Sequence, residues 1–317
     1  MIQQTAIRVG TRGSALALAQ SGQVADRLSR ITGSPVELVT VLTHGDHSRE
    51  SLSSLGGTGV FASALRESLL AGDCDLVVHS LKDLPTVAHP GLRIAAVPQR
   101  ADARDALCTR EGLGLDALPR GAVVGTGSPR RVAQLRTKRP DLEIADIRGN
   151  VDSRLGRLVE GDLDAVLLAA AGLGRLGRSD AVTELLELSD WPTAPGQGAL
   201  AIEAREESTA ALDAALSSLD HAASRLTAQA EREVLARLEA GCAAPIGATA
   251  EFDDGLLFLT ATVYAPDGTA SITSSHALVA EGTAAQRSAQ PLELGARVAD
   301  ELLERGAADL APLGGGR

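Results

Sequence analysis

The chain has 317 residues, a formal net charge of −11, 44% hydrophobic residues and 22% charged residues. A length above the ~100–150 residues of an ordinary domain predicts two or three domains, and this composition is typical of a globular protein. The negative net charge argues against a nucleic-acid partner and against an anionic membrane surface, although it is compatible with a local basic cleft.

No apolar run approaches the ~20 residues of a membrane-spanning helix, and the N-terminal sequence MIQQTAIRVG does not resemble a signal peptide. We therefore expect a cytoplasmic protein with no membrane partner. The cysteines Cys74, Cys108 and Cys242 contain no CxxC pair, so the sequence indicates neither a disulfide framework nor a zinc site. No metal is expected.

The first third of the chain alternates predicted strands with predicted helices. Apolar runs bounded by turn residues indicate the strands, and 3.6-residue periodicity indicates the helices. The strands are expected at 6–10, 36–42, 75–79 and 92–97, and the helices at 14–30 and 60–70. This βαβ pattern predicts a mostly parallel sheet.

The alternation restarts after Pro98 and predicts a second α/β domain. Strands are expected at 105–109, 122–125, 142–147 and 165–169, and helices at 129–137 and 151–160. The segment 191–196 contains prolines and a glycine and resembles a hinge. The strand predicted after it, at 199–204, is expected to return to the first sheet.

The order of predicted strands and helices changes from about Asp220. A long helix is predicted at 222–238, strands at 248–252, 256–264 and 272–279, and a last helix near 292–305, which together indicate a small α+β domain. We therefore predict three domains. They comprise residues 1–98 with 199–217, residues 99–198, and residues 218–317.

The motif GTGSPRR carries the strongest local signal for a binding site. Gly125 ends a strand, Ser128 is a good N-cap, Pro129 suits the first helical position, and Arg130 and Arg131 fall in the first turn. Cations are unfavourable at the positive end of a helix, so their presence indicates a bound anion. The alternative is a solvated pair of surface arginines.

The same arrangement recurs at two other strand ends. Arg148 precedes the N-cap Asn150, with Arg154 one turn into the helix, and Arg12 precedes Ser14 after the first strand. Open α/β sheets bind ligands at the carboxyl ends of their strands, and arginine pairs with planar carboxylates or phosphates. The sequence therefore predicts an enzyme whose substrate carries several carboxylates.

A second motif, HSLKDLP, directly follows a buried strand. Asp83 beside Lys82 is placed to stabilise a cation or to transfer a proton, but an Asp before a turn with proline is equally ordinary as a turn residue. His79 ends an apolar run, which favours a core histidine over a ligand.

A third motif, AGCAAPIG, places Cys242 among small residues after the long helix. A thiol exposed there could ionise and act as a nucleophile or as an attachment point. Cys74 and Cys108 lie in or beside apolar strands and fit the role of small buried hydrophobes better.

The sequence GLGRLG at 172–177 satisfies G-x-G-x-x-G but does not predict a dinucleotide site. No second strand ending in an acidic residue follows about 20 positions later. The sequence contains no Walker loop, HExxH or GxSxG motif either.

Seven motifs together resemble one family. They are TRGSALALAQ, VHSLKDLPT, GTGSPRR, IRGNVDSRL, AAAGLGRLG, PGQGALAIE and AGCAAPIG, and their order and spacing are similar to those of the porphobilinogen deaminases, or hydroxymethylbilane synthases, up to about Gly268. The resemblance implies two doubly wound α/β domains like those of periplasmic binding proteins, plus a small α+β C-terminal domain. It also implies a dipyrromethane cofactor, joined to Cys242 by a thioether.

The resemblance implies a transferase of porphyrin and heme biosynthesis. Four porphobilinogen molecules would each lose ammonia and add head-to-tail to the cofactor, and hydrolysis would release hydroxymethylbilane. The enzyme is expected to be a monomer whose partners are its small-molecule substrate and, for hand-off of the product, uroporphyrinogen-III synthase.

The resemblance also implies residue roles. Asp83 and Lys82 would be catalytic, with Asp83 contacting the pyrrole NH groups. Cofactor binding is expected at Cys242, Arg12, Ser14, Asp83, Ser128, Arg130, Arg131, Arg148 and Arg154. Substrate binding is expected at Arg12, Gln20, Arg148, Arg154 and Arg175.

The chain departs from the family pattern at the Gly-rich loop, where Ser54, Thr58 and Ser63 replace lysines. A rival hypothesis is a binding module of the periplasmic type that holds a dicarboxylate or another anion without catalysis. The loop cysteine argues against that hypothesis, because a binding module needs no attachment point.

Overall fold

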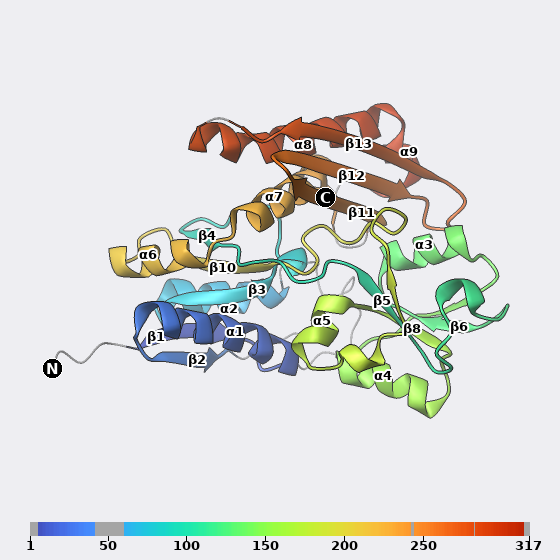
Figure 1. Ribbon diagram of the computed structural model, residues 1–317, viewed down its shortest axis with the longest axis horizontal. Coiled ribbons are helices and arrows are strands. Elements are labelled where there is room, and N and C mark those ends of the chain that lie inside the picture. Colours follow the sequence, from blue (N-terminus) through green and yellow to red (C-terminus); the bar gives the residue numbers. More distant parts are fainter. Residues whose placement is uncertain (1–5, 42–59, 242–243, 282, 314–317) are drawn as a thin grey trace. The chain divides into compact units, whose positions relative to one another are not determined.

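The computed structural model describes residues 6–41, 60–241, 244–281 and 283–313 (Figure 1). Two compact units are present, and each is described by itself. Unit 1 consists of Met1–Ala101 and Ala199–Arg225, and unit 2 consists of Asp102–Gly198 and Leu226–Arg317. Within the described ranges no helix is both long enough and apolar enough to cross a membrane.

Unit 1 contains a five-stranded sheet in the order β2-β1-β3-β10-β4. The strands are β1 (Ile7–Thr11), β2 (Val36–Thr40), β3 (Leu76–Ser80), β4 (Leu92–Ala96) and β10 (Leu200–Arg205). β1 is parallel to β2 and β3, whereas β10 is antiparallel to both β3 and β4. The predicted return of the chain to this sheet is confirmed.

The prediction of a mostly parallel sheet is wrong, since half of the pairings are antiparallel. The βαβ argument holds for β1, β2 and β3, which successive helical crossovers connect. It fails at β10 because this strand enters the sheet from a distant part of the chain and not through a local crossover.

Helices cover both faces of this sheet. α1 (Ala15–Thr32) and α6 (Ala210–Leu219) pack on one face, and α2 (Val60–Ala71) packs on the other. Of these three helices, α6 was not predicted from the sequence. Alternation along β3 explains this arrangement, because Leu76 and Val78 point into the first core and Val77 into the second. The fold of unit 1 is therefore doubly wound.

Unit 2 begins with a second five-stranded sheet, in the order β7-β6-β8-β5-β9. The strands are β5 (Asp105–Thr109), β6 (Val123–Gly125), β7 (Glu143–Ala145), β8 (Ala165–Ala169) and β9 (Glu184–Leu186). β6 is parallel to β7 and β8, and β5 is antiparallel to β8 and β9. The sequence missed β9, whose three residues are too few for a periodic pattern.

This sheet is also covered on both faces. α3 (Pro129–Lys138) packs on one core through Leu135, and α4 (Val151–Glu160) and α5 (Ala170–Arg175) pack on the other through Leu158 and Leu173. Gly172 and Gly174 of the GLGRLG sequence lie inside α5. They therefore do not form the strand-to-helix turn that a dinucleotide site needs.

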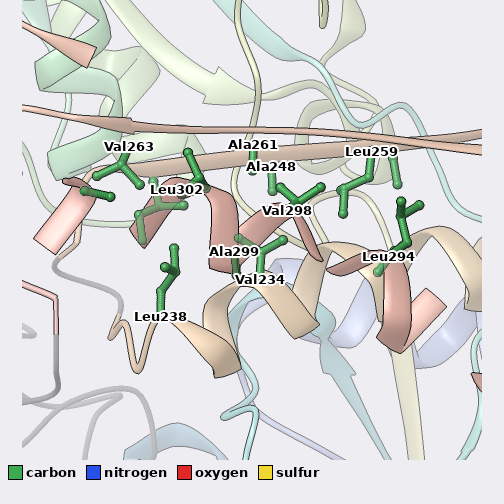
Figure 2. Close-up of a cluster of buried hydrophobic side chains, with 14 of the residues drawn as sticks. Val234, Leu238, Ala248, Leu259, Ala261, Val263, Leu294, Val298, Ala299 and Leu302 are labelled. Carbon is green, nitrogen blue, oxygen red and sulfur yellow. The ribbon is translucent and has the colours of Figure 1, made fainter. Parts of the chain in front are cut away.

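The C-terminal part of unit 2 is an antiparallel meander of β11 (Ile246–Asp253), β12 (Leu256–Tyr264) and β13 (Ser271–Val279). Figure 2 shows α7 (Ala222–Arg237) and α8 (Ala284–Glu304) packed together against one face of this sheet, with Val234, Val298 and Leu259 in the shared core. A short α9 (Ala307–Leu310) follows. The predicted fold class, α/β with a smaller α+β part, is confirmed.

The predicted start of the last helix, near Leu292, is wrong. α8 begins at Ala284, where Thr283 and Gln286 form a capping box, and Pro291 lies inside the helix. Two reciprocal hydrogen bonds at the N-terminus stabilise the first turns. The prediction placed the start just after the proline, because prolines usually mark helix ends.

Within unit 2 the C-terminal sheet lies against the segment 191–198. The amide of Ala248 donates to the carbonyl of Thr193 at 2.8 Å, and a Cβ added at Gly247 would lie 2.5 Å from the carbonyl oxygen of Pro192. The buried Glu231 of α7 accepts from the amides of Gly196 at 2.7 Å and Ala250 at 2.8 Å. This close approach requires a residue without a side chain at Gly247.

Candidate functional site

In unit 1, the turn after β1 is fixed by side chains that bond to the backbone. Ser14 is the N-cap of α1, and its hydroxyl accepts from the amide of Ala17 at 3.3 Å. The buried hydroxyl of Thr11 donates to the carbonyl of Ala17 at 3.2 Å. Arg12 lies half-buried between these residues, and Gln20 is buried one turn further along α1. The predicted N-cap is confirmed.

Asp83 and Lys82 belong to a short 3-10 helix, η2 (Leu81–Asp83), directly after β3. Leu81 and Leu84 are buried on either side, and the amide of Leu84 donates to the carbonyl of Leu81 at 3.2 Å. Asp83 is exposed and Lys82 is half-buried. A fixed turn thus offers a carboxylate to the solvent, where a ligand can reach it.

His79 is a core histidine, as the sequence predicted. Its Nε2 lies 2.9 Å from Oε2 of Glu203, an ion-pair distance without hydrogen-bond alignment, and both residues are buried. Arg66 forms two hydrogen bonds to the same carboxylate, at 2.8 and 3.0 Å. Burial alone would raise the pKa of Glu203, but its contacts with His79 and Arg66 outweigh that effect and lower the pKa to about 2.

In unit 2, Arg130 and Arg131 both contact one buried carboxylate. Nη2 of Arg131 lies 2.6 Å from Oδ1 of Asp105, and Nη2 of Arg130 lies 2.9 Å from Oδ2. Both arginines are buried, and Asp105 is fully buried. The two guanidinium groups hold the pKa of Asp105 far below its usual range, although burial alone would raise it.

The arginine pair is therefore not the solvated surface pair of the alternative interpretation. An anion does lie beside it, but that anion is Asp105 of the same chain. Ser128 occupies the predicted N-cap position of α3, although its hydroxyl makes no capping hydrogen bond. Contact of Ser128, Arg130 and Arg131 with a ligand stays a prediction.

Arg148 and Arg154 lie at the start of α4, near the pair. Asn150 caps this helix by accepting from the amide of Ser153 at 2.8 Å, and Nε of Arg154 donates to the carbonyl of Gly149 at 2.9 Å. The exposed Arg148 lies 3.3 Å from Asp146. Burial and the positive charges of Arg131 and Arg148 lower the pKa of Arg154.

Arg175, at the end of α5, is a desolvated cation. Its Nη2 donates to the carbonyl of Gly198 at 2.7 Å, and its Nε is buried without a hydrogen-bond partner in the described part of the chain. Burial lowers the pKa of Arg175. Within the described ranges, neither Arg154 nor Arg175 forms a salt bridge. Both arginines are half-buried, and an arginine partly removed from water usually has a carboxylate partner.

Three positions named in the sequence analysis lie outside the described residues. They are Cys242, Ser54 and Thr58. Ser63 lies within α2. The buried Cys74 and Cys108 have raised pKa values because of their burial, as expected for unreactive core thiols. No group of His, Cys, Asp and Glu side chains suited to a metal ion occurs among the residues that the structure describes.

Comparison with known proteins settles the family. The model of the porphobilinogen deaminase dipyromethane cofactor binding domain matches residues 7–213, and that of the porphobilinogen deaminase C-terminal domain matches residues 225–304. The chain belongs to the porphobilinogen deaminase family.

Curated relatives agree over nearly the full length. Porphobilinogen deaminase of Leifsonia xyli is 63% identical over 99% of this chain and 96% of its own length. Porphobilinogen deaminase 1 of Streptomyces coelicolor is 50% identical over 97% of this chain and 98% of its own length. An arginine-specific periplasmic binding protein of Salmonella typhimurium is 16% identical, with a TM-score of 0.38, over 67% of this chain and 92% of that chain. That score is too low to support any conclusion.

As a porphobilinogen deaminase family member, the chain is a transferase of tetrapyrrole biosynthesis with hydroxymethylbilane synthase activity and a dipyrromethane cofactor. The unpaired cations of unit 2 fit that cofactor, whose rings carry carboxylates. Arg154 and Arg175 are half-buried guanidinium groups, and neither has a carboxylate at ion-pair distance among the described residues. An anionic ligand would supply the missing partners.

The sequence analysis missed the residues that hold the arginine pair. Asp105 contacts both arginines, and the side chains of Trp191 and Gln197 donate hydrogen bonds to its carboxylate. Gln197 lies in the motif PGQGALAIE, which was used only to recognise the family. A lone Asp at the start of an apolar strand was the one available signal for a buried ion pair.

Proposed function

We propose that the residues described above carry out the family reaction, the stepwise condensation of four porphobilinogen molecules followed by release of hydroxymethylbilane. The cation cluster of Arg131, Arg148 and Arg154 is the observation that supports this most directly. Like charges held close together raise the free energy of a site unless an anion joins them. A growing chain of pyrroles, with two carboxylates on each ring, is such an anion.

We assign the dipyrromethane cofactor to Cys242, which lies outside the described residues. When bound, it supplies the free α-carbon to which the first substrate ring is added. The residues proposed to hold its carboxylates and ring nitrogens are Arg12, Ser14, Asp83, Ser128, Arg130, Arg131, Arg148 and Arg154. Their hydroxyl and guanidinium groups are donors that match carboxylate oxygens.

Asp83 is the proposed catalytic carboxylate. An ionised carboxylate accepts hydrogen bonds from pyrrole NH groups and stabilises the positive charge that develops when ammonia leaves the substrate. It also accepts or returns the proton at the reacting carbon. Lys82, its neighbour in η2, is the second residue proposed to be catalytic.

Arg12, Gln20, Arg148, Arg154 and Arg175 are the proposed substrate-binding residues. Each incoming porphobilinogen brings an acetate and a propionate, and a planar guanidinium binds either one with two parallel hydrogen bonds. Because the tethered chain lengthens, the same arginines must bind successive carboxylates. They would therefore act as a track along which the chain moves.

We also propose a domain organisation and partners for this chain. Residues 1–98 with 199–217, 99–198 and 218–317 form three domains, of which the last two share unit 2. We propose a cytoplasmic monomer that hands its product to uroporphyrinogen-III synthase. The absence of a partner helix in the sequence pattern and the acidic net charge of −11 support a monomer that stays dispersed in solution.

Intact-mass spectrometry of the purified chain tests the cofactor assignment. We expect the mass of two linked pyrrole units on the native chain and none on Cys242→Ser. Cys108→Ala is the matched control, because this thiol is buried in a core and its loss should leave the adduct in place. An adduct retained in Cys242→Ser would overturn the assignment. A chain without any adduct after exposure to porphobilinogen would favour the binding-module hypothesis.

A further inference from the structure

Four groups from two segments of unit 2, the start of α3 and residues 191–197, converge on Asp105. Oδ1 accepts from Arg131 at 2.6 Å and from Nε2 of Gln197 at 2.8 Å. Oδ2 accepts from Nε1 of Trp191 at 2.9 Å and lies 2.9 Å from Nη2 of Arg130, an ion-pair distance. Each oxygen therefore contacts one guanidinium and one neutral donor, so the carboxylate is held from both sides.

The remaining contacts leave one guanidinium nitrogen of each arginine without a partner. Arg130 donates from Nη1 to Oε1 of Gln134 at 2.7 Å and to the carbonyl of Pro192 at 3.3 Å, and Arg131 donates from Nη1 to the carbonyl of Leu167 at 2.8 Å. Nε of both arginines is buried and has no partner among the described residues. Buried polar groups are rarely left unpaired, so these two atoms point to a missing acceptor.

The net charge of Arg130, Arg131 and Asp105 also indicates that an acceptor is missing. Two guanidinium groups and one carboxylate leave a single excess positive charge in a buried place. Arg131 is also close enough to Arg154 to lower its pKa, so the excess extends toward the start of α4. Asp105 compensates enough charge for the pair to be buried and leaves enough to attract one more carboxylate.

We propose that Asp105 is a positioning residue for cofactor binding. Its carboxylate holds Arg130 and Arg131 by their Nη2 atoms, so that the pair meets a carboxylate of the dipyrromethane with fixed geometry. This proposal rests on the assignment of the two arginines as cofactor-binding residues. Asp105 itself touches neither cofactor nor substrate and acts through the arginines.

Two roles for Asp105 predict opposite effects of Asp105→Asn. If the carboxylate only lowered the local positive charge, the substitution would strengthen anion binding. If it positions the guanidinium groups, the substitution weakens binding even though the site becomes more positive, because an amide accepts on one atom and donates on the other. The proposal commits to the second result.

The experiment measures how fast the full-length chain gains its cofactor. Protein made in cells that produce no porphobilinogen is mixed with porphobilinogen, and intact mass is followed over time. Asp105→Asn should gain the adduct roughly 10- to 100-fold more slowly than the native chain, the range typical of losing an outer partner of a ligand site. Circular dichroism establishes that each variant is folded at the assay temperature.

Asp164→Asn is the matched control. Asp164 also lies in unit 2, pairs with Arg110 at 2.7 Å and accepts from the amide of Val123 at 2.8 Å, but it bonds neither Arg130 nor Arg131. It should load at the native rate. Loading of Asp105→Asn within about twofold of this control, or faster than it, would overturn the proposal.

A milder variant covers the case in which Asp105→Asn does not fold. Trp191→Phe removes one neutral donor from Oδ2 and keeps both ion pairs. It should slow loading by a smaller factor, and loading at the native rate would again contradict the proposal.

Arg131→Gln separates this inference from the proposed function. If Arg131→Gln loads normally, the assignment of the arginine pair itself is wrong. If Arg131→Gln loads slowly while Asp105→Asn loads like the control, only the role of Asp105 is wrong. In the fraction that does load, KM for porphobilinogen should be unchanged in Asp105→Asn, because the pair is assigned to the cofactor and not to the incoming ring.

Discussion

Arg131 in α3 lies close enough to Arg154 in α4 for its positive charge to lower the pKa of Arg154. The two arginines come from different strand-to-helix turns of the same sheet. Repulsion between them is unfavourable in the free protein, so a bound carboxylate between or beside them gains affinity by relieving it. Removing Arg154, which is assigned to the substrate as well as to the cofactor, should therefore affect the binding of a lengthening polyanion.

We expect Arg154→Gln to stall elongation. Mass spectra should show accumulated protein carrying one, two or three added substrate rings, and the rate of bilane release should fall by about 10- to 1,000-fold, the effect of losing one or two charge-assisted hydrogen bonds. Arg157→Gln is the control, because Arg157 lies in the same helix and pairs with Asp162 at the surface. Spectra without intermediates would contradict the idea of a track.

Asp83→Ala should nearly eliminate bilane formation while the cofactor stays bound. General acid–base catalysis contributes ~10²–10⁴-fold, which sets the expected loss of rate. The bound cofactor is detected by its colour with an aldehyde reagent. Asp26→Ala removes an exposed carboxylate from α1 in the same unit and should leave turnover unchanged. Turnover like that of the native chain in Asp83→Ala would remove Asp83 from the mechanism.

Glu203 should make the stability of the protein depend on acidic pH. Its pKa is lowered from the ordinary value of 4.5 to about 2, so its contribution is complete above about pH 4.5 and is lost as the pH falls toward 2. That shift corresponds to roughly 3 kcal/mol in the free energy of unfolding. Roughly 1 kcal/mol of this is lost between about pH 6 and about pH 3.5, and urea unfolding followed by circular dichroism at these two pH values measures that loss.

Glu203→Gln is the comparison for this effect. The variant leaves the buried Arg66 without its counterion and should be less stable by ~3–5 kcal/mol near neutral pH. Its stability should also change less than that of the native chain between the two pH values. An equal change in both proteins would assign the acid sensitivity to other carboxylates.

Gly247→Ala should destabilise unit 2. The added Cβ would lie 2.5 Å from the carbonyl oxygen of Pro192, which forces the start of β11 away from the segment 191–198. Overpacking of this kind costs about 1–3 kcal/mol, measured as a lower Tm. Gly156→Ala is the matched control, because a Cβ there meets nothing within 4 Å and an alanine favours the helix α4. An equal Tm in the two variants would contradict this close packing.

Local signals predicted the starts of α1 and α4 well. Ser14 and Asn150 cap these helices through hydrogen bonds that involve residues only three positions away, so the sequence contains all the necessary information. The apolar runs at β3 and β5 likewise predicted strands, and both are buried. Such features depend on the order of residues along one element.

Features that join distant segments were not predictable in this way. Arg66 and Glu203 are 137 positions apart, and Asp105 and Arg131 are 26 apart. Periodicity predicts which face of a helix or strand is buried, but it does not predict which residues of other segments contact that face. The arginines after β6 were expected to bind an anionic ligand, which stays a prediction, and their pairing with Asp105 was not foreseen. Motif resemblance supplied the reaction, which the local patterns alone left open.

The position of β10 has a consequence for the order in which the chain is made. This strand lies between β3 and β4, and Leu200, Ile202 and Ala204 belong to the core of unit 1. A ribosome must therefore deliver more than 200 residues before the first sheet can close. Until then β3 presents an unpaired edge, which is a template for aggregation. Chaperone binding to nascent chains should accordingly persist until residue 205 has left the exit tunnel.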